Sequence, residues 1–297
     1  MQGWRRTMED AHLVALDQGP ESQTHIFGVF DGHGGREVAL FCKNHFPQIF
    51  LSNSSYLLGN IKTALIETFI ELDKALQTPQ GMKELTVEHK KFIEEFNLTK
   101  AKEDFYENFN TNKGYIDNLA YTIGCTANIL VIHKNELYFA NCGDSRSILL
   151  RHGEAISMSI DHKPELPNEF ERIRKAGGTV KDGRVNGALN LSRSIGDFQF
   201  KTKKDLKPKD QIVTCYPDVL YETITKDDDF IVIGCDGIWE CITNEGIADY
   251  IYDKLRNNPN ITLCSILEDI FERNVAKNSD DEEGCDNMTC LLIQLKK

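Results

Sequence analysis

The sequence predicts an α+β protein whose sheet is mainly antiparallel. Its apolar, strand-like runs follow one another in blocks, as at 125–133, 136–142 and 147–151. Segments with an apolar residue at every third or fourth position, which is typical of amphipathic helices, form separate blocks. Strict alternation of strands and helices would instead indicate a parallel sheet. Many strands and few long helices favour two packed sheets flanked by helix pairs, although periodicity alone leaves that arrangement open.

The first part of the chain predicts one strand and two helices. Residues 25–31 are expected to form a short strand that ends in a glycine-rich turn. Two helices follow, because apolar residues recur there near 3.6 spacing. Their apolar faces are formed by Val38, Phe41, Cys42, Phe46 and Ile49 in the first helix, and by Ile61, Leu65, Phe69, Leu72 and Leu76 in the second.

The second part of the chain predicts more strands than helices. Glycines at the end of one helix and an Asn before another are typical helix boundaries. The expected elements are strands at 125–133, 136–142 and 147–151, a helix at 169–176 closed by Gly177 and Gly178, a strand at 229–235, a helix capped by Asn244, a helix with Leu263, Ile266, Leu267, Ile270 and Phe271, and a strand at 288–295.

Composition excludes several classes of protein. The 297 residues are 40% hydrophobic and carry no repeat or low-complexity linker, which favours one domain over residues 1–297. A formal net charge of −12 argues against nucleic-acid binding, which normally uses a basic surface. An acidic surface suits a protein that concentrates divalent cations, although solvation is the commoner reason for it. No apolar run approaches the roughly 20 residues of a membrane span.

Cysteine usage indicates the compartment. The nine cysteines are an odd number, none lies in a CxxC pair, and Cys125, Cys142, Cys235 and Cys290 lie inside apolar runs. Reduced, buried cysteines are typical of proteins from reducing compartments. The first four residues do not resemble a signal peptide. We therefore expect a cytoplasmic or nuclear location.

Carboxylates at strand ends or turns are the most informative feature. They are Glu9, Asp10, Asp31, Asp144, Asp197, Asp236 and Asp286. Three of these aspartates directly follow or precede apolar strands, where a carboxylate is costly unless it is paired or bound to a metal. Oxygen ligands with little His or Cys select Mg²⁺ or Mn²⁺ rather than Zn²⁺. Glycines after Asp31 and Asp236 allow close backbone approach, so that a carbonyl can add a ligand. Each Asp-Gly pair taken alone is more often an ordinary turn.

Ten short motifs occur in order along nearly the whole chain, and together they are far more specific than any one of them. They are 3–12, 29–35, 124–127, 141–146, 161–164, 176–178, 184–187, 191–197, 235–239 and 286–288. This set resembles the PP2C (PPM) family of metal-dependent protein phosphatases. The resemblance implies a central β-sandwich of two antiparallel sheets with helices outside, and metals in a cleft at one end.

The resemblance also implies a set of metal ligands. Asp31 is similar to the carboxylate that bridges two metals, and the Gly32 carbonyl would complete the shell of one of them. Asp236 and Asp286 would hold the other metal.

The resemblance implies other roles for three further carboxylates. Glu9 and Asp10 would act mostly through metal-bound waters. Asp144, together with Asp236, resembles a weaker site for a third ion.

Two residues resemble catalytic groups of the family. Arg5 is similar to the guanidinium that binds phosphate, and its planar fork suits phosphate oxygens. His33 resembles the general acid that protonates the leaving oxygen. Without the family resemblance, His33 would be interpreted as a polar turn residue, and Arg5 as the ion-pair partner of nearby Glu9. Asp197 is open between a metal contact, a turn cap and a pair with Arg193.

The implied function is hydrolysis of phosphoserine and phosphothreonine in proteins. A water that bridges two Mg²⁺ or Mn²⁺ ions would attack phosphorus directly, with no phosphoenzyme. The CxxxxxR loop of cysteine phosphatases does not occur in the sequence. Phosphorylated proteins are therefore the expected partners.

Three regions carry separate expectations. The chain begins almost at the first motif, whereas relatives usually carry an extra N-terminal strand, whose loss would open a sheet edge. An insertion at about 77–120 has Leu85, Phe92, Phe96, Phe105 and Phe109 at helical spacing. It predicts a pair of surface helices or, more sharply, a partner-docking element. Residues at about 165–184 resemble a flap beside the metal cleft.

Two other function classes compete with an active phosphatase. A pseudophosphatase would bind phosphoproteins without turnover, but intact Asp31, Asp236 and Asp286 argue against it. A two-metal nuclease is disfavoured by the net charge of −12.

Overall fold

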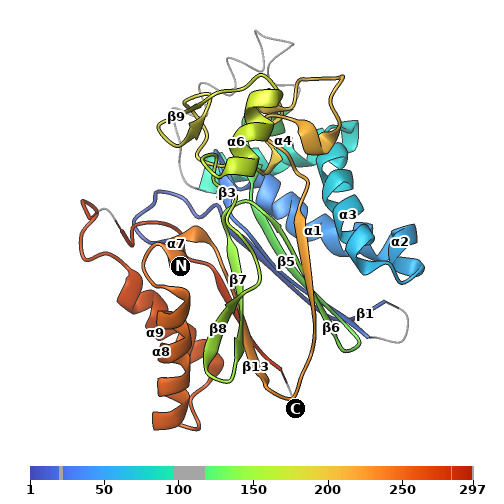
Figure 1. Cartoon of the computed structure of the whole chain (residues 1–297). Helices are drawn as coiled ribbons and strands as arrows, with labels where there is room; N and C mark the ends of the chain where they lie inside the picture. The colour runs from blue at the N-terminus through green and yellow to red at the C-terminus, as the bar shows by residue number, and fades with distance from the viewer. Residues whose placement is uncertain (20–22, 96–117, 282, 296–297) are drawn as a thin grey trace. The chain divides into compact units, whose positions relative to one another are not determined.

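The computed structural model describes residues 1–19, 23–95, 118–281 and 283–295. These residues form two compact units, each assembled from stretches that are separated in the sequence (Figure 1). The first unit comprises Met1–Asp31, Ala127–Asp161 and Asp218–Lys297, and the second comprises Gly32–Thr126 and His162–Pro217. The expectation of a single domain stays a prediction.

Two antiparallel sheets form the framework of the first unit. One has the strand order β1-β2-β5-β6-β12 and the other has the order β14-β13-β7-β8. The strands are β1 (Ala11–Gln18), β2 (Thr24–Phe30), β5 (Ala127–His133), β6 (Glu136–Cys142), β7 (Arg146–Arg151), β8 (Glu154–Ser157), β12 (Asp218–Thr223), β13 (Asp228–Gly234) and β14 (Cys290–Gln294). Every neighbouring pair runs antiparallel, which confirms the predicted sheet type.

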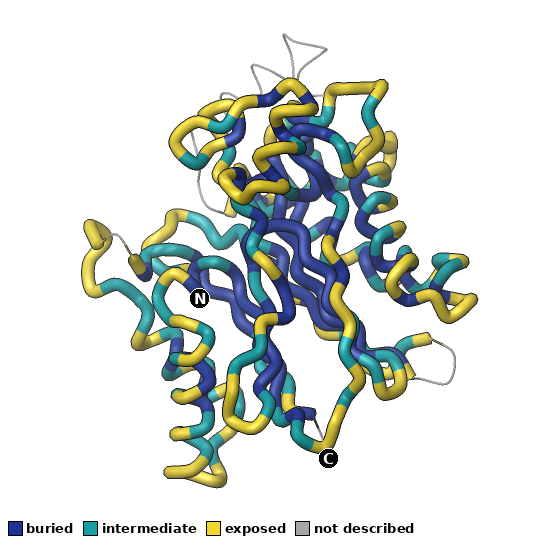
Figure 2. Tube along the Cα trace, in the orientation of Figure 1, coloured by how far each residue is buried: buried dark blue, intermediate teal, exposed yellow. Residues whose placement is uncertain are grey.

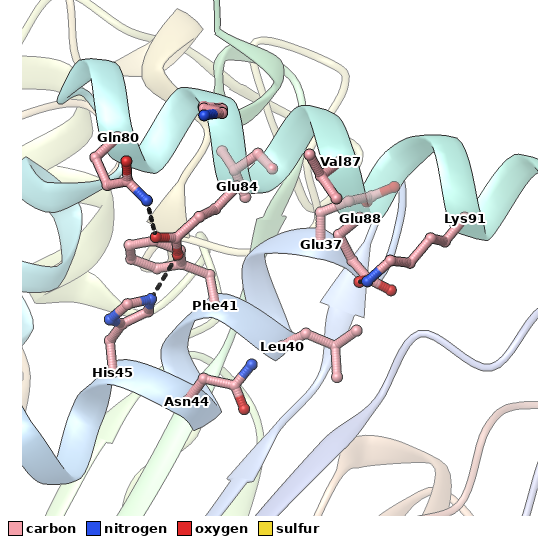
Figure 3. A pocket seen from close by; sticks show the side chains of 12 residues that line it. Glu37, Leu40, Phe41, Asn44, His45, Gln80, Glu84, Val87, Glu88 and Lys91 are labelled. Carbon is pink, nitrogen blue, oxygen red and sulfur yellow. Dashed lines mark hydrogen bonds and ion pairs between the residues drawn. The ribbon is translucent and has the colours of Figure 1, made fainter.

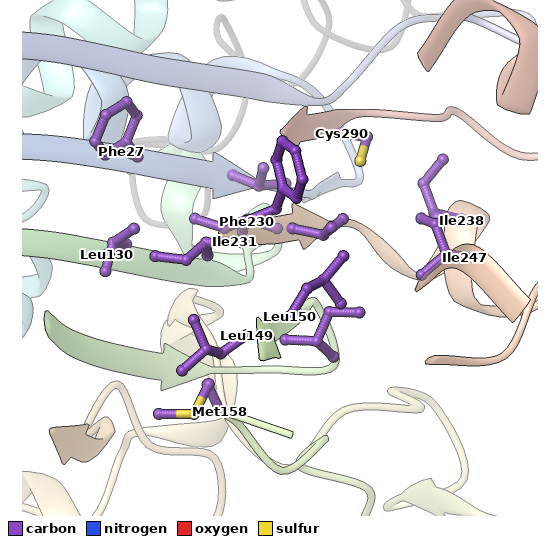
Figure 4. Packing of buried hydrophobic residues seen from close by; sticks show 14 of the residues in the cluster. Phe27, Leu130, Leu149, Leu150, Met158, Phe230, Ile231, Ile238, Ile247 and Cys290 are labelled. Carbon is purple, nitrogen blue, oxygen red and sulfur yellow. The ribbon is translucent and has the colours of Figure 1, made fainter. Parts of the chain in front are cut away.

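Apolar side chains from both sheets share one buried core. Phe27 on β2 and Leu130 on β5 belong to the same cluster as Leu149 on β7 and Ile231 on β13 (Figure 4). The trace of these strands is largely buried (Figure 2). The two sheets therefore form a β-sandwich, as the family resemblance implies.

Two helices cover part of the four-stranded sheet. α8 (Asn244–Asn257) packs against β8, and α9 (Leu263–Asn274) packs against β14. Asn244 was expected to cap the first of these helices, but the N-cap is Thr243, whose hydroxyl accepts a hydrogen bond from the Gly246 amide. A short helix, α7 (Asp236–Trp239), directly follows β13.

Helices and short strands form the second unit. The helices are α1 (Glu37–Ser52), α2 (Ser54–Leu57), α3 (Ile61–Ala75), α4 (Pro79–Glu95) and α6 (Pro167–Lys175), with single turns η2 (Leu119–Tyr121), η3 (Phe198–Phe200) and η4 (Pro208–Asp210). The strands β3 (Gly32–His33), β4 (Gly124–Cys125) and β11 (Ile195–Gly196) form one small sheet, and β9 (Val180–Lys181) pairs with β10 (Arg184–Val185).

The two helices predicted after residue 35 are confirmed. All five apolar positions expected on the second of them are buried, four in α3 and Leu76 at its C-cap. In α1 the expected positions are also buried, except that Phe50 is buried where Ile49 was expected and Ile49 is only half-buried. Phe50 stacks on Phe46 with ring centroids 5.9 Å apart, which favours its place in the core.

Polar pairs hold α4 to α1. A pocket of about 280 Å³ lies between these helices, and the Glu84 carboxylate within it accepts a hydrogen bond from Gln80 and pairs with His45 at 2.7 Å (Figure 3). Glu37, which is buried, pairs with His89 at 2.5 Å. The helix expected from Leu85 and Phe92 is thus present in α4, whereas Phe96, Phe105 and Phe109 lie outside the described residues.

The segment expected to act as a flap shares a small apolar core with residues that follow it in the chain, between Val185 and Val213. α6 begins with Pro167 at its first position, and Ile173 on its inner face is buried with Val185 and Val213. The turn between β9 and β10 contains Asp182 and Gly183, which both have positive φ, as a tight hairpin requires. The helix predicted here is confirmed, and the role as a flap stays a prediction. In the described part of the chain, no helix is long and apolar enough to cross a membrane.

Replacing Ile231 by Ala tests the sandwich core. Ile231 lies in the middle of β13 and is fully buried. We expect the free energy of unfolding to fall by about 2–5 kcal/mol, because the substitution removes buried methyl groups and leaves a cavity. Chemical denaturation measures the effect. Leu220→Ala on the edge strand β12, where the side chain is exposed, is the control and should change stability by less than about 0.5 kcal/mol. Equal losses of unfolding free energy in Ile231→Ala and Leu220→Ala would contradict the burial of Ile231 in the sandwich core.

Candidate functional site

Strand register brings Asp10 and Asp31 together in the first unit. Asp10 directly precedes β1 and Asp31 directly follows β2. These strands are antiparallel with Ala11 opposite Phe30, so the start of one lies beside the end of the other. The two aspartates therefore meet at one end of the five-stranded sheet.

The four-stranded sheet gathers three more aspartates at one of its ends. Gly234, the last residue of β13, is paired with the first residue of β7 and with the first residue of β14. Asp236 therefore leaves β13 at the end where Asp144 precedes β7 and Asp286 precedes β14.

Four of these five aspartates, all except Asp286, belong to two overlapping groups that could hold a metal ion. Asp31, Asp144 and Asp236 each offer a carboxylate oxygen, and these oxygens lie within 4.8 Å of one another. Asp10, Asp31 and the Cys235 sulfur satisfy the same limit. Asp31 belongs to both groups, which is the arrangement expected of a bridging carboxylate.

Buried amide side chains fix the turn that carries Asp144. The Asn141 side-chain amide donates to the Gly143 carbonyl at 3.0 Å. The Asn128 amide donates to Asn141 Oδ1 at 3.0 Å and to the Ser145 carbonyl at 3.2 Å. Because these amides are buried, they hold the turn rigidly and so orient the Asp144 carboxylate.

Asn287 ties the N-terminal segment to the same region. Its Oδ1 accepts from the Glu9 amide at 2.8 Å, and its Nδ2 donates to the Thr7 carbonyl at 3.0 Å. Arg5 pairs with Asp286 at 2.5 Å, whereas the Glu9 carboxylate accepts from the Thr7 hydroxyl at 2.7 Å. Hydrogen bonding to Asp286 raises the pKa of Arg5 above its ordinary value.

A glycine permits the close contact between these segments. Close backbone approach was expected after Asp236, and it is found at Gly237. A Cβ atom added to Gly237 would lie 2.1 Å from the Asn287 carbonyl oxygen, which is far inside van der Waals contact. The close neighbour of this glycine is thus the backbone of the segment that carries Asp286.

Burial and like charge perturb these carboxylates strongly. Burial raises the pKa of Asp31 well above its ordinary range, and the charges of Asp236, Asp10 and Asp144 add to the effect. Burial likewise raises the pKa of Asp236 to about 7, and that of Asp10 to about 6. The cluster therefore gathers more negative charge than it can keep ionised at neutral pH without a compensating cation.

The donor set fits a hard divalent cation. Asp10 Oδ2 is buried and makes no hydrogen bond, so it has an unused acceptor. The Cys235 sulfur accepts from the Thr289 amide at 3.1 Å, and burial raises the pKa of this thiol well above its usual value. A neutral thiol is a poor ligand, which leaves the carboxylate oxygens that Mg²⁺ and Mn²⁺ prefer.

Gly32 and His33 belong to the second unit, although they directly follow Asp31 in the chain. Both lie in β3, where Gly32 is opposite Cys125. His33 Nε2 lies 2.7 Å from an Asp197 carboxylate oxygen. Of the alternatives weighed for Asp197, a pair with Arg193 is not what is found: Arg193 pairs with Glu169 at 2.7 Å.

Sequence reasoning missed the asparagines that hold the segments carrying these carboxylates. Asn128 and Asn141 were interpreted only as parts of predicted strands, and Asn287 only as part of the 286–288 motif, so no hydrogen-bonding role was predicted for them. A signal did exist, since a polar amide inside an otherwise apolar strand is costly to bury without partners. The identity of those partners was not readable from the sequence.

The acidic cluster predicts an unusual dependence of stability on pH. Because the folded-state pKa of Asp236 is raised from 3.8 to about 7, its contribution to stability is complete below about pH 4 and is lost as the pH rises through 7. In EDTA, we expect the melting temperature of the wild type to fall across this range more than that of Asp236→Asn. Mg²⁺ should restore more stability at pH 8 than at pH 5. The melting temperature is measured by calorimetry as a function of pH. Parallel profiles for the wild type and Asp236→Asn would show that the pH dependence does not come from Asp236.

Comparison with known proteins points to one family. The family model described as protein phosphatase 2C matches residues 1–91 and 82–283. A probable protein phosphatase 2C 3 from Paramecium tetraurelia is 42% identical over 300 residues, which cover 100% of this chain and 91% of the relative. A probable protein phosphatase 2C 21 from Arabidopsis thaliana is 41% identical over 307 residues, which cover 100% and 85%.

Solved structures share the fold. A crystal structure of a phosphatase from a pathogenic strain of Toxoplasma gondii has a TM-score of 0.71 at 21% identity, covering 100% of this chain and 92% of that one. A serine-threonine phosphatase 2C from Toxoplasma gondii has a TM-score of 0.65 at 19% identity, covering 99% and 92%. The predicted α+β fold is therefore confirmed. With a family model matching most of its length and relatives near 40% identity across all of it, this chain belongs to the protein phosphatase 2C family.

Proposed function

We propose that this chain hydrolyses phosphoserine and phosphothreonine in proteins with the help of divalent cations held by the carboxylates of the first unit. The observation that carries the proposal is the convergence of Asp10, Asp31, Asp144 and Asp236 at strand ends. Burial and the charge of neighbouring carboxylates raise the pKa of Asp10, Asp31 and Asp236. Family membership supplies the reaction class, and the acidic cluster supplies a place for it.

Each carboxylate has a proposed role toward the cations. Asp31 would contribute to the binding of two ions, and Asp236 and Asp286 would hold one of them. The Gly32 carbonyl would add a ligand to the other ion.

The remaining carboxylates act around this centre. Glu9 and Asp10 act mainly through water, and Asp144 with Asp236 offers a weaker third site. When bound, Mg²⁺ or Mn²⁺ supplies the Lewis acidity that activates water for direct attack on phosphorus and offsets phosphate charge.

Arg5 is the proposed phosphate-binding residue. Its side chain is 60% exposed, and a guanidinium has five N–H donors. Its contact with Asp286 therefore leaves donors for substrate oxygens and orients the planar fork beside a proposed metal ligand.

His33 is the proposed general acid. It donates a proton to the serine or threonine oxygen as the bond from that oxygen to phosphorus breaks. This role matters most for alkyl leaving groups, because their alkoxides are strongly basic.

Other roles remain proposals of the same kind. The substrates would be phosphorylated proteins, and a cytoplasmic or nuclear location agrees with the nine cysteines, all described and none in a disulfide. The 165–184 segment would act as a flap, and the 77–120 insertion would dock partners.

A direct assay tests the proposed function. We expect hydrolysis of p-nitrophenyl phosphate and of a phosphothreonine peptide with Mn²⁺ or Mg²⁺, and none in EDTA. Activity that persists unchanged in EDTA would refute the role of the cations. Binding of phosphopeptide without turnover, with cations present, would favour a pseudophosphatase.

Asp236→Asn should abolish nearly all turnover while the fold persists. Removing one ligand charge weakens the hold on the cation and its effect on the pKa of water. Steady-state kinetics at saturating Mn²⁺ and circular dichroism measure the two effects. Asp253→Asn makes the same chemical change on an exposed part of α8 and serves as the control. Near wild-type rates for Asp236→Asn would rule out its assignment.

The loss of activity caused by His33→Gln should depend on the leaving group of the substrate. We expect a loss on the order of 10²–10⁴-fold on the phosphothreonine peptide, because the alkoxide then leaves without a proton. The loss should be much smaller on p-nitrophenyl phosphate, whose leaving group needs little protonation. Equal losses on both substrates would indicate a structural role for His33.

A further inference from the structure

A buried polar network lies beside His33 in the second unit. Asp197 is 1% exposed, yet its Oδ2 contacts His33 Nε2 at 2.7 Å and accepts from the Ser194 hydroxyl at 2.6 Å. Burial acts to raise the pKa of Asp197, but the charge and hydrogen bond of His33, the Ser194 hydroxyl and Lys201 together lower it below the ordinary value. The carboxylate therefore stays ionised and serves as an acceptor for the imidazole.

The small three-stranded sheet is built so that this pair can form. Gly124 in the middle strand β4 lies opposite His33 in β3 and opposite Gly196 in β11. A Cβ atom on Gly124 would lie 2.2 Å from Asp197 Oδ2 and 2.7 Å from His33 Nε2. The absence of a side chain in the middle strand thus leaves the space in which the two outer strands bring these groups together.

A second buried pair fixes the segment that carries Asp197. Lys201 Nζ lies 2.7 Å from Asp73 Oδ1 and donates to the Ser194 carbonyl at 2.9 Å. The same Asp73 oxygen accepts from the Gly196 amide at 2.9 Å. Asp197 itself has φ 53°, a left-handed conformation that is costly for a residue other than glycine unless its surroundings impose it. The segment is held from both sides, so the carboxylate has a fixed position.

We infer that Asp197 is a positioning residue that acts through His33, and that it does so by holding the Nε2–H group. A carboxylate acceptor at Nε2 fixes the ring orientation and keeps a proton on that nitrogen. The proton that reaches the leaving oxygen then comes from Nδ1. As the bond from oxygen to phosphorus breaks, the Nδ1–H proton passes to that oxygen, and His33 becomes a neutral imidazole that retains its Nε2 proton. This inference rests on the proposed role of His33 as general acid.

A double-mutant cycle tests the inference. We expect Asp197→Asn to lose about 10²-fold in kcat on the phosphothreonine peptide, as misplacement of a reacting group does. The loss should be much smaller on p-nitrophenyl phosphate. In the His33→Gln background, Asp197→Asn should have no further effect on the peptide, because groups that act as one unit are not additive. If Asp197 had a purely structural role, Asp197→Asn would lower kcat equally on both substrates and in both backgrounds. That result would overturn the inference.

Gly124→Ala provides a second route that keeps both side chains. Gly124 has no positive φ, so alanine is conformationally allowed, but its methyl group would force the carboxylate and imidazole apart. We expect the same selective loss on the peptide, and no additional loss with His33→Gln. The readout is the ratio of the rate on the phosphothreonine peptide to the rate on p-nitrophenyl phosphate. Because both rates scale with the amount of folded enzyme, the ratio does not depend on it. A ratio equal to that of the wild type would overturn the inference.

Controls separate this inference from the proposed function. Glu84→Gln removes the charge from another His–carboxylate pair, which joins His45 of α1 to α4 at 2.7 Å, and should leave the substrate ratio unchanged. Wild-type protein without cation-dependent activity would refute the proposed function itself. A selective loss in His33→Gln combined with a wild-type ratio in Asp197→Asn would refute only the role of Asp197.

Discussion

Electrostatic repulsion among buried carboxylates is the constraint on which the first unit depends. Asp31 and Asp236 sit where two antiparallel sheets end, and burial raises the pKa of each. Such a cluster destabilises the fold unless a cation compensates it, which favours a binding role for these carboxylates over a packing role. The surrounding contacts serve this arrangement: Asn141 holds the turn before β7, and Asn287 joins the N-terminal segment to the segment before β14.

Glycines, which have no side chain, matter in this structure as much as the charged residues. Gly237 lets the start of α7 approach the Asn287 carbonyl, and Gly124 leaves room for the contact between His33 and Asp197. In both places a methyl group would occupy the space of a polar contact. Close backbone approach is therefore a means that each unit uses within itself to bring polar atoms together.

Local elements were predictable where one physical signal dominated. The helices α1 and α3 follow from apolar periodicity, because each must bury one face. The strand β1 was missed although Ala11 and Leu13 are buried and alternate with exposed His12 and Val14, which is a period of two. The edge strand β12 was missed because only Val219 is buried in it, so its pattern is weak. Thr243 rather than Asn244 caps α8, since both residue types suit a cap and the sequence does not fix the boundary.

By itself the sequence determined the chemistry: an α+β chain with acidic residues at strand ends, which offer the oxygen ligands that hard cations prefer, and a set of motifs that identify the family. The partners were decided by tertiary structure. Arg5 meets Asp286 rather than nearby Glu9, and Asp197 meets His33 rather than nearby Arg193. The physical reason is that a side chain pairs with whatever group the strand register brings within about 3 Å. That register is set by burial of the whole sheet rather than by neighbours in the chain.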